Sequence, residues 1–308
     1  MEHARLAAID IGTNSVLLTV AEVEPGGGLR PVVERATITR LGRGVDGSGR
    51  LCRESCERTL ACLREYAEEL RATRARRLAV VGTSALRDAR NGERFLLDAT
   101  SILGVRPEVV DGRREAELTF RGAVSALDVS GPVIVFDVGG GSTEVIGGAV
   151  RGDRAKVDVE QSLDIGSVRL SERHLRSDPP SPTAIDVLRR AARDQLSALR
   201  TTCRDAQLIG VAGTATTLAA IANEITRYDA AIVHGCRLSR NTVHELAVRL
   251  SALPLCARRE VAGLAPDRAD IIVAGAWICF ELMDHLGGGE VTISDRGVRW
   301  GLLHELAS

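Results

Sequence analysis

Hydrophobic positions along the 308-residue chain fall into two patterns. Short apolar runs predict buried strands, whereas apolar residues three and four positions apart predict helices. The elements predicted for the first part of the chain are, in order, a β-hairpin over 6–23, a strand over 30–39, an amphipathic helix over 54–71, a buried strand over 78–82, a helix over 94–103, a strand over 107–110 and a helix over 114–124.

The second part of the chain repeats this order. Its predicted elements are a hairpin over 133–149, a strand over 156–163, a helix from 168, a long helix to about 200, a strand over 208–211 followed by a helix, helices over 243–253 and 269–286, a strand over 291–294 and a short final helix. Three strands followed by alternating helices and strands, twice over, predict an α/β protein with mixed sheets. We expect two domains, 1–126 and 127–308, with the last helix (about 297–308) able to pack back on the first domain.

Each predicted domain opens with a strand that ends in aspartate and runs into a turn of glycine and hydroxyl residues. Asp10 precedes the first turn, Gly12-Thr13-Asn14-Ser15, and Asp137 precedes the second, Gly139-Gly140-Gly141-Ser142-Thr143-Glu144. Glycine lets the backbone approach a ligand closely, and rows of backbone N–H groups in such turns bind anions such as phosphate. We expect the two turns to face each other and to clamp a phosphate chain and a metal between the domains.

Composition excludes several other classes of protein. The net charge of −1 argues against non-specific binding to nucleic acid. No apolar run approaches the roughly 18 residues of a membrane span, and a strand that starts at Leu6 leaves no room for a signal peptide. Seven scattered cysteines without a CxxC pair indicate free thiols in a reducing compartment. We therefore expect a cytoplasmic protein that binds neither membrane nor nucleic acid.

Two other glycine-rich or basic signals carry less weight. Lys156 is the only lysine, and its neighbours Ala155 and Val157 cannot form a Walker A loop. Residues 42–47 match GxGxxG, but Ser48-Gly49-Arg50 follow where a dinucleotide-binding turn would open a helix. We expect residues 42–47 to form a surface loop whose substitution affects stability alone.

Taken together, the motifs resemble one known family. The two turns are similar to the phosphate loops of the actin, Hsp70 and sugar-kinase superfamily. The segments around them resemble the Ppx/GppA (exopolyphosphatase/guanosine pentaphosphate phosphatase) branch, in its short two-domain form. The matching segments are AIDIGTNS (8–15), GTSALRDARN (82–91), VDGRREAEL (110–118), FDVGGGSTE (136–144), Gly213-Thr214 and ISDRGVRWG (293–301). The resemblance implies two ribonuclease-H-like α/β domains with an interdomain cleft.

The resemblance also implies roles for single residues. Glu115 matches the glutamate that orients the attacking water, although a glutamate in the first turn of a helix can also serve only the helix dipole. Arg114 departs from the acid that many relatives carry there, and its charge should help Glu115 stay ionised. Arg87 matches an arginine that reaches the phosphate chain, and Arg90 is a weaker candidate.

Carboxylates beside a phosphate turn are the hard oxygen ligands that Mg²⁺ takes. Asp137 and Glu144 are therefore the expected metal ligands (Mg²⁺ or another divalent cation), and Asp10 is a further candidate. The expected phosphate-binding residues come from both turns, from Arg87 and from the Gly213 region. They are Gly12, Thr13, Asn14, Ser15, Arg87, Gly139, Gly140, Gly141, Ser142, Thr143, Gly213 and Thr214.

Several functions remain open at this stage. The first is an exopolyphosphatase that releases terminal orthophosphate from inorganic polyphosphate with Mg²⁺, through water activated by Glu115. The second is hydrolysis of pppGpp to ppGpp. Each of these two nucleotides could instead act as an inhibitor. A non-catalytic polyphosphate or alarmone sensor and a phosphotransferase similar to the sugar kinases complete the set. A 3% aromatic content offers no evident purine pocket and favours polyphosphate. We also expect a homodimer.

Overall fold

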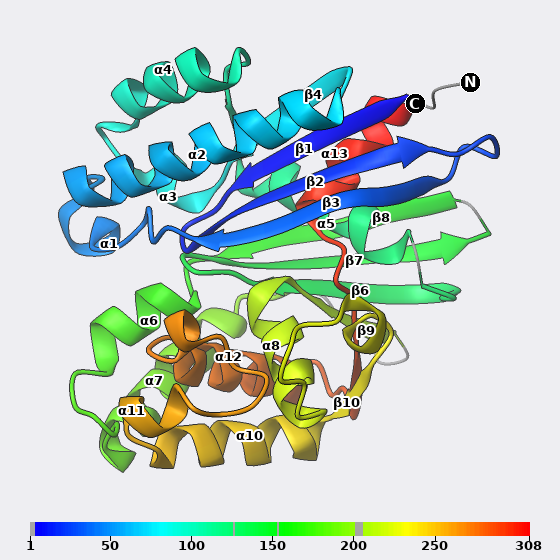
Figure 1. Ribbon diagram of the computed structural model, residues 1–308. Helices are drawn as coiled ribbons and strands as arrows, with labels where there is room; N and C mark the ends of the chain where they lie inside the picture. The colour runs from blue at the N-terminus through cyan, green and yellow to red at the C-terminus, as the bar shows by residue number, and fades with distance from the viewer. Residues whose placement is uncertain (1–3, 126, 153, 201–205) are drawn as a thin grey trace. The chain divides into compact units, whose positions relative to one another are not determined.

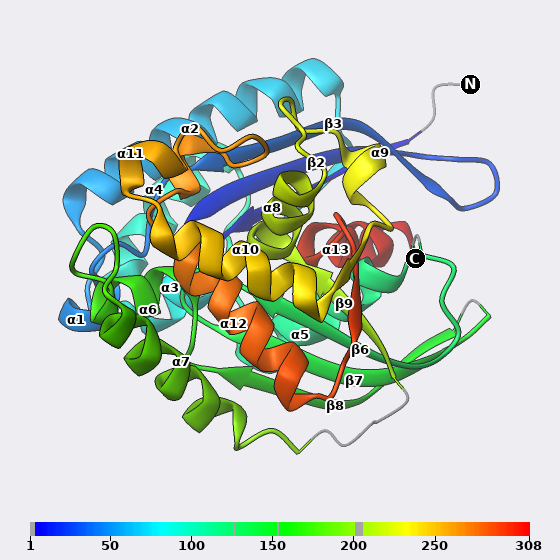
Figure 2. The same ribbon diagram turned by 90° about the horizontal axis from the view of Figure 1, so that it is seen from below.

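The computed structural model describes residues 4–125, 127–152, 154–200 and 206–308. The chain divides into two compact units, Met1–Gly122 with Val298–Ser308 and Ala123–Gly297. The division thus falls between residues 122 and 123, whereas the boundary predicted from the sequence follows residue 126. The final helix belongs to the first unit. Each unit contains one mixed β-sheet with helices (Figures 1 and 2). The α/β class predicted from the hydrophobic pattern is confirmed.

The first unit is built on a five-stranded sheet with the order β3-β2-β1-β4-β5. β1 pairs antiparallel with β2 and parallel with β4, so the opening hairpin and the later strand share one sheet. The strands are β1 (Arg5–Ile11), β2 (Ser15–Val23), β3 (Leu29–Ile38), β4 (Arg77–Gly82) and β5 (Glu108–Val109). The helices are α1 (Val45–Ser48), α2 (Arg53–Thr73), α3 (Ser84–Asp88), α4 (Gly92–Leu103), α5 (Gly112–Val124) and α13 (Val298–Ala307).

Helices cover both faces of this sheet because β1 is apolar on both sides. Its odd-numbered residues, Ala7, Ile9 and Ile11, belong to a core shared with α2 and α4. Leu6 and Ala8 point the other way, into a second core shared with α5 and α13. Side chains alternate between the two faces of a strand, so a continuous apolar run such as 6–9 specifies a strand buried on both sides.

Helix α13 packs closely against α5. A Cβ atom on Gly301 would lie 2.1 Å from the Leu118 carbonyl oxygen, so only glycine permits this approach of the two backbones. Near the end of α13, the Glu305 carboxylate accepts two hydrogen bonds from Arg114, of 2.8 and 2.6 Å. Arg121 donates to the same carboxylate at 3.2 Å. These contacts fix the last helix of the chain to the helix that carries Glu115.

The second unit is built on a six-stranded sheet with the order β10-β11-β9-β6-β7-β8. The strands are β6 (Gly131–Val138), β7 (Thr143–Arg151), β8 (Arg154–Leu163), β9 (Gln207–Val211), β10 (Arg237–Ser239) and β11 (Glu290–Ile293). The helices are α6 (Ser167–His174), α7 (Pro182–Leu196), α8 (Ala212–Ala222), α9 (Ala230–Val233), α10 (Arg240–Ala252), α11 (Leu255–Arg258), a short 3₁₀ turn (Pro266–Arg268) and α12 (Ile272–His285).

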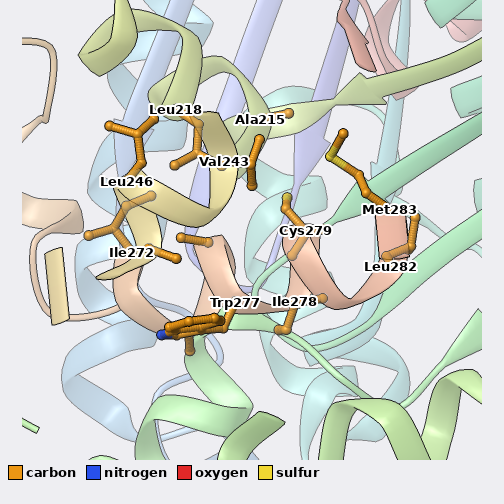
Figure 3. Close-up of a cluster of buried hydrophobic side chains, with 14 of the residues drawn as sticks. Ala215, Leu218, Val243, Leu246, Ile272, Trp277, Ile278, Cys279, Leu282 and Met283 are labelled. Carbon is orange, nitrogen blue, oxygen red and sulfur yellow. The ribbon is translucent and has the colours of Figure 1, made fainter. Parts of the chain in front are cut away.

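The core of the second unit is centred on α12, which is buried along most of its length. Figure 3 shows Trp277, Ile278 and Leu282 of α12 in the cluster that also contains Leu218 from α8 and Leu246 from α10. A helix that is apolar on all sides must be covered by other elements. In Figure 2, α10 and α12 of the second unit run side by side.

Two expectations from composition bear on the fold. Among the residues that the structure describes, no helix combines the length and the apolar character needed to cross a membrane. Six of the seven cysteines are free thiols (Cys52, Cys56, Cys62, Cys236, Cys256 and Cys279). The seventh, Cys203, lies outside the described residues.

Candidate functional site

In the first unit, Glu115 lies in the first turn of α5 and is buried, with 7% of its surface exposed. Asp111 begins this helix by accepting the Arg114 backbone N–H through its side chain at 2.8 Å, a typical N-terminal cap. Arg87 lies near the end of α3. Its Nη1 donates hydrogen bonds to Glu115 Oε2 at 3.0 Å and to the Val110 carbonyl at 3.1 Å. The structure therefore brings together the two residues expected to act as base and as phosphate ligand.

The Arg114 side chain is bonded to the last helix. Its guanidinium is engaged by Glu305 of α13, and this hydrogen bond is the main cause that raises the pKa of Arg114. Arg87 is a cation in direct contact with Glu115, at 3.0 Å. The influence of the Arg114 charge on Glu115 stays a prediction. Arg90, the weaker candidate, donates to the Ser48 carbonyl at 3.1 Å and so braces the region of α1.

The first glycine turn is closed by a hydrogen bond from Gly12 N–H to the Ser15 carbonyl, 3.0 Å long. The Thr13 carbonyl accepts from Gly42 N–H, and the Asn14 carbonyl accepts from Thr39 and Arg40 N–H. In a trans peptide the N–H group points opposite to the C=O group. The N–H groups of Asn14 and Ser15 are therefore directed away from residues 39–42, and glycine turns in other proteins bind anions with N–H groups of this kind.

Residues 42–47 are more than a surface loop, which corrects the expectation from the sequence. Gly42 is buried, and a Cβ atom on it would lie 2.3 Å from Thr13 Cγ2 and 3.1 Å from Ala85 Cβ. Gly47 in the same segment has no atom within 4 Å of that position. Gly42 therefore supports the first turn directly.

We expect Gly42→Ala to displace Thr13, raise the KM for a phosphate-chain substrate, and cost about 1–3 kcal/mol of stability through overpacking. Gly47→Ala is the matched control and should leave both quantities unchanged. Thermal unfolding and initial rates over a range of substrate concentrations measure the two effects. Equal behaviour of the two variants would contradict the role of Gly42.

The second turn repeats the closing bond of the first: Gly139 N–H donates to the Ser142 carbonyl at 3.0 Å. Its three glycine carbonyls all accept hydrogen bonds from the start of α6. The donors are Ser167 N–H for Gly139, Val168 and Arg169 N–H for Gly140, and Arg169 Nε for Gly141. The N–H groups of Gly140, Gly141 and Ser142 therefore point away from α6, in the same direction. Backbone N–H groups presented by a glycine turn in this way are suited to bind an anion.

This packing depends on Gly166, which the sequence analysis did not single out. A Cβ atom there would lie 2.4 Å from the Gly140 carbonyl oxygen, a contact that backbone atoms cannot relieve. Thr143 is fully buried, and its hydroxyl donates to the Ile165 carbonyl at 2.7 Å, so this side chain braces the turn. Ser142, also buried, lies at the turn itself.

The carboxylates Asp137 and Glu144 lie directly opposite each other on β6 and β7. They are 8% and 1% exposed, and Glu144 accepts a hydrogen bond from Ser162 Oγ at 2.9 Å. Two like charges opposed across a strand pair repel each other, which a divalent cation would relieve. In the first unit, by contrast, Asp10 is opposite Leu17. The pair Asp137 and Glu144 thus fits Mg²⁺ better than Asp10 does.

Protein ligands alone would not fill the coordination sphere. Within the described part of the chain, no group of three or more His, Cys, Asp or Glu side chains is arranged to hold a metal. Mg²⁺ commonly keeps several waters and takes only one or two carboxylates together with substrate phosphates. On α12, burial raises the pKa of the Cys279 thiol to about 12, and the charge of Asp137 raises it further.

Thr214 and Gly213 occupy the first turn of α8. Thr214 Oγ1 donates to the Val138 carbonyl at 2.8 Å, which fixes α8 to the end of β6. The Arg268 guanidinium lies against Gly213, since a Cβ atom on Gly213 would be 2.1 Å from Arg268 Nη1. Burial lowers the pKa of Arg268. Sequence reasoning missed this arginine because it belongs to no local motif and approaches Gly213 only through the fold.

Comparison with known proteins identifies the family. A model of the Ppx/GppA phosphatase family matches residues 19–308. Exopolyphosphatase 2 of Mycobacterium tuberculosis is 40% identical, over 100% of both chains. Guanosine-5'-triphosphate,3'-diphosphate pyrophosphatase of Aeromonas hydrophila is 30% identical over 97% of this chain and 59% of its own length. The crystal structure of an exopolyphosphatase-like protein matches with a TM-score of 0.91 at 34% identity, covering 99% of this chain and 98% of that one. The chain belongs to the Ppx/GppA phosphatase family.

Proposed function

We propose that this protein is an exopolyphosphatase that hydrolyses the terminal phosphoanhydride bond of inorganic polyphosphate. The observation that carries the proposal is the buried Glu115 at the start of α5, held at 3.0 Å by Arg87. Phosphoryl transfer requires positioning and electrostatic stabilisation more than covalent participation by the protein. A buried carboxylate beside a cation is suited to orient a water molecule and to accept its proton.

In the proposed reaction, a water molecule attacks the terminal phosphorus. Its proton passes to the Glu115 carboxylate and its oxygen forms the new P–O bond. The P–O bond to the bridging oxygen breaks, and that oxygen leaves with the shortened chain as orthophosphate is released. Asp137 and Glu144 would hold Mg²⁺, which supplies charge neutralisation at the phosphate oxygens when it is bound. Each glycine turn carries backbone N–H groups that are suited to bind phosphate oxygens.

The preference for polyphosphate over pppGpp rests on two observations. The relative named exopolyphosphatase aligns over its full length, whereas the pyrophosphatase of Aeromonas extends well beyond the aligned region. The chain is also poor in aromatic residues, at 3%, which are common platforms for a purine base. Hydrolysis of pppGpp is the alternative activity, and a polyphosphate or alarmone sensor is the alternative without catalysis.

A panel of substrates distinguishes these functions. Purified protein with Mg²⁺ is given short polyphosphate, long polyphosphate, pppGpp and ATP separately, and orthophosphate release is followed. The proposal predicts the highest kcat/KM for one of the polyphosphates. Higher kcat/KM for pppGpp would establish the alternative activity, and binding of polyphosphate without phosphate release would establish a sensor. Omission of Mg²⁺ in a parallel set tests the proposed cation.

Arg87→Lys should lower kcat/KM for polyphosphate about tenfold, because an ammonium group cannot donate to Glu115, Val110 and a phosphate with the geometry of a guanidinium. We expect a raised KM for the lost phosphate contact and a lowered kcat for the displaced base. Arg90→Lys, three residues along the chain, is the control and should be close to wild type. Steady-state kinetics of both variants measure these effects. Unchanged kcat and KM in Arg87→Lys would contradict the proposal that Arg87 contacts the phosphate chain and positions Glu115.

A further inference from the structure

Arg169 of α6 bonds to the second glycine turn through both its side chain and its backbone. Its Nε donates to the Gly141 carbonyl at 2.6 Å, and its backbone N–H donates to the Gly140 carbonyl at 3.1 Å. The side chain is only 11% exposed, and it lies 3.8 Å from the carboxylate of Asp164, which is 82% exposed. A nearly buried guanidinium therefore binds the outer side of the predicted phosphate loop.

The contact has a direct consequence for the opposite side of the loop. The Gly141 carbonyl and the Ser142 N–H belong to the same peptide, so they point in opposite directions. A charged donor that holds this carbonyl fixes the orientation of the Ser142 N–H and polarises the peptide, which makes that N–H a stronger donor. The positive charge of Arg169, together with the positive end of α6, also lies behind the loop and favours an anion in front of it.

We propose that Arg169 is a positioning residue for phosphate binding: it holds the glycine turn so that its N–H groups face the phosphate chain. The inference rests on the proposed function and adds a residue to it. The carbonyls of the first turn are held instead by backbone N–H groups of Thr39, Arg40 and Gly42. In the second turn, a side-chain guanidinium holds the Gly141 carbonyl.

The role predicts a particular kinetic pattern. Loop N–H groups that bind the substrate and the transition state equally well change KM and leave kcat nearly unaffected. Arg169→Gln removes the charge and shortens the side chain, so KM should rise about tenfold with a much smaller change in kcat. Arg169→Lys keeps the charge but loses the planar donor geometry, and we expect an intermediate KM.

Binding can be measured separately from hydrolysis in the Glu115→Gln background, where the ligand is not consumed. Calorimetric titration with tripolyphosphate should show an affinity about tenfold lower when Arg169→Gln is added. Arg173→Gln removes an exposed arginine from the same helix and should bind as the background does. A folded Arg169→Gln variant with unchanged affinity and KM, even with a lower melting temperature, would reduce Arg169 to a structural role and overturn the inference.

The outcomes separate this inference from the proposed function. If wild-type protein neither binds nor hydrolyses tripolyphosphate or longer chains, the proposed function fails and the inference fails with it. If wild type hydrolyses polyphosphate and Arg169→Gln keeps its affinity, only the inference fails. If Arg169→Gln does not fold, Arg169→Lys takes its place in the titration, and an affinity equal to that of the Glu115→Gln background overturns the inference.

Discussion

Glu115→Gln should abolish nearly all phosphate release while phosphate-chain binding and the fold are retained. The amide is almost isosteric with the carboxylate and can still contact Arg87, but it cannot accept a proton from water. Loss of a general base costs about 10²–10⁴ in rate. The measurement is kcat with short polyphosphate, accompanied by calorimetric titration with tripolyphosphate.

Glu117→Gln is the matched control for this experiment. Glu117 lies two residues further along α5 and pairs with Arg113 at 3.5 Å on the surface of the helix. The variant changes the same charge on the same helix, so it should keep wild-type turnover. Wild-type turnover in a folded Glu115→Gln variant would contradict the proposal that Glu115 is the general base.

Asp137→Asn should cause the second largest loss, because it removes one of two opposed carboxylates proposed to hold Mg²⁺. We expect activity to fall by at least about 10- to 100-fold, the range found when groups that support a bound metal are replaced. The Mg²⁺ concentration for half-maximal activity should rise in the same variant. Rates over a range of Mg²⁺ concentrations measure both changes.

Asp10→Asn provides the comparison within the molecule. Asp10 occupies the equivalent position in the first turn but is opposite Leu17, so it lacks a second carboxylate across the strand pair. We expect its requirement for Mg²⁺ to change less than that of Asp137→Asn. A larger shift in Asp10→Asn than in Asp137→Asn would contradict the assignment of the cation to the second unit.

Long elements with a regular apolar period could be predicted from the sequence. The helix expected over 54–71 is α2, Arg53–Thr73, and the strand expected over 78–82 is β4, Arg77–Gly82. Short helices were missed. α3 and α9 have five and four residues, which is too short to establish a helical period. Their helical form depends on tertiary contacts rather than on local pattern.

The candidate site was predictable where its residues follow one another in the chain. Asp137 and Glu144 flank one turn, and the turn itself places them opposite each other. Contacts between distant segments could not be derived in this way. Tertiary packing sets three such contacts: Gly166 against Gly140, Arg268 against Gly213, and Glu305 with Arg114. The last of these shows that a charged side chain can bond to a distant segment of the chain, since adjacent helix residues point in different directions.

In the proposed reaction, water attacks the terminal phosphorus of a polyphosphate chain. Hydrolysis of short polyphosphate with Mg²⁺ in ¹⁸O-labelled water, followed by mass spectrometry of both products, is the most direct test. We expect one ¹⁸O atom in each orthophosphate that is released and none in the shortened chain. Label at the new end of the chain, or chain shortening without labelled orthophosphate, would contradict it.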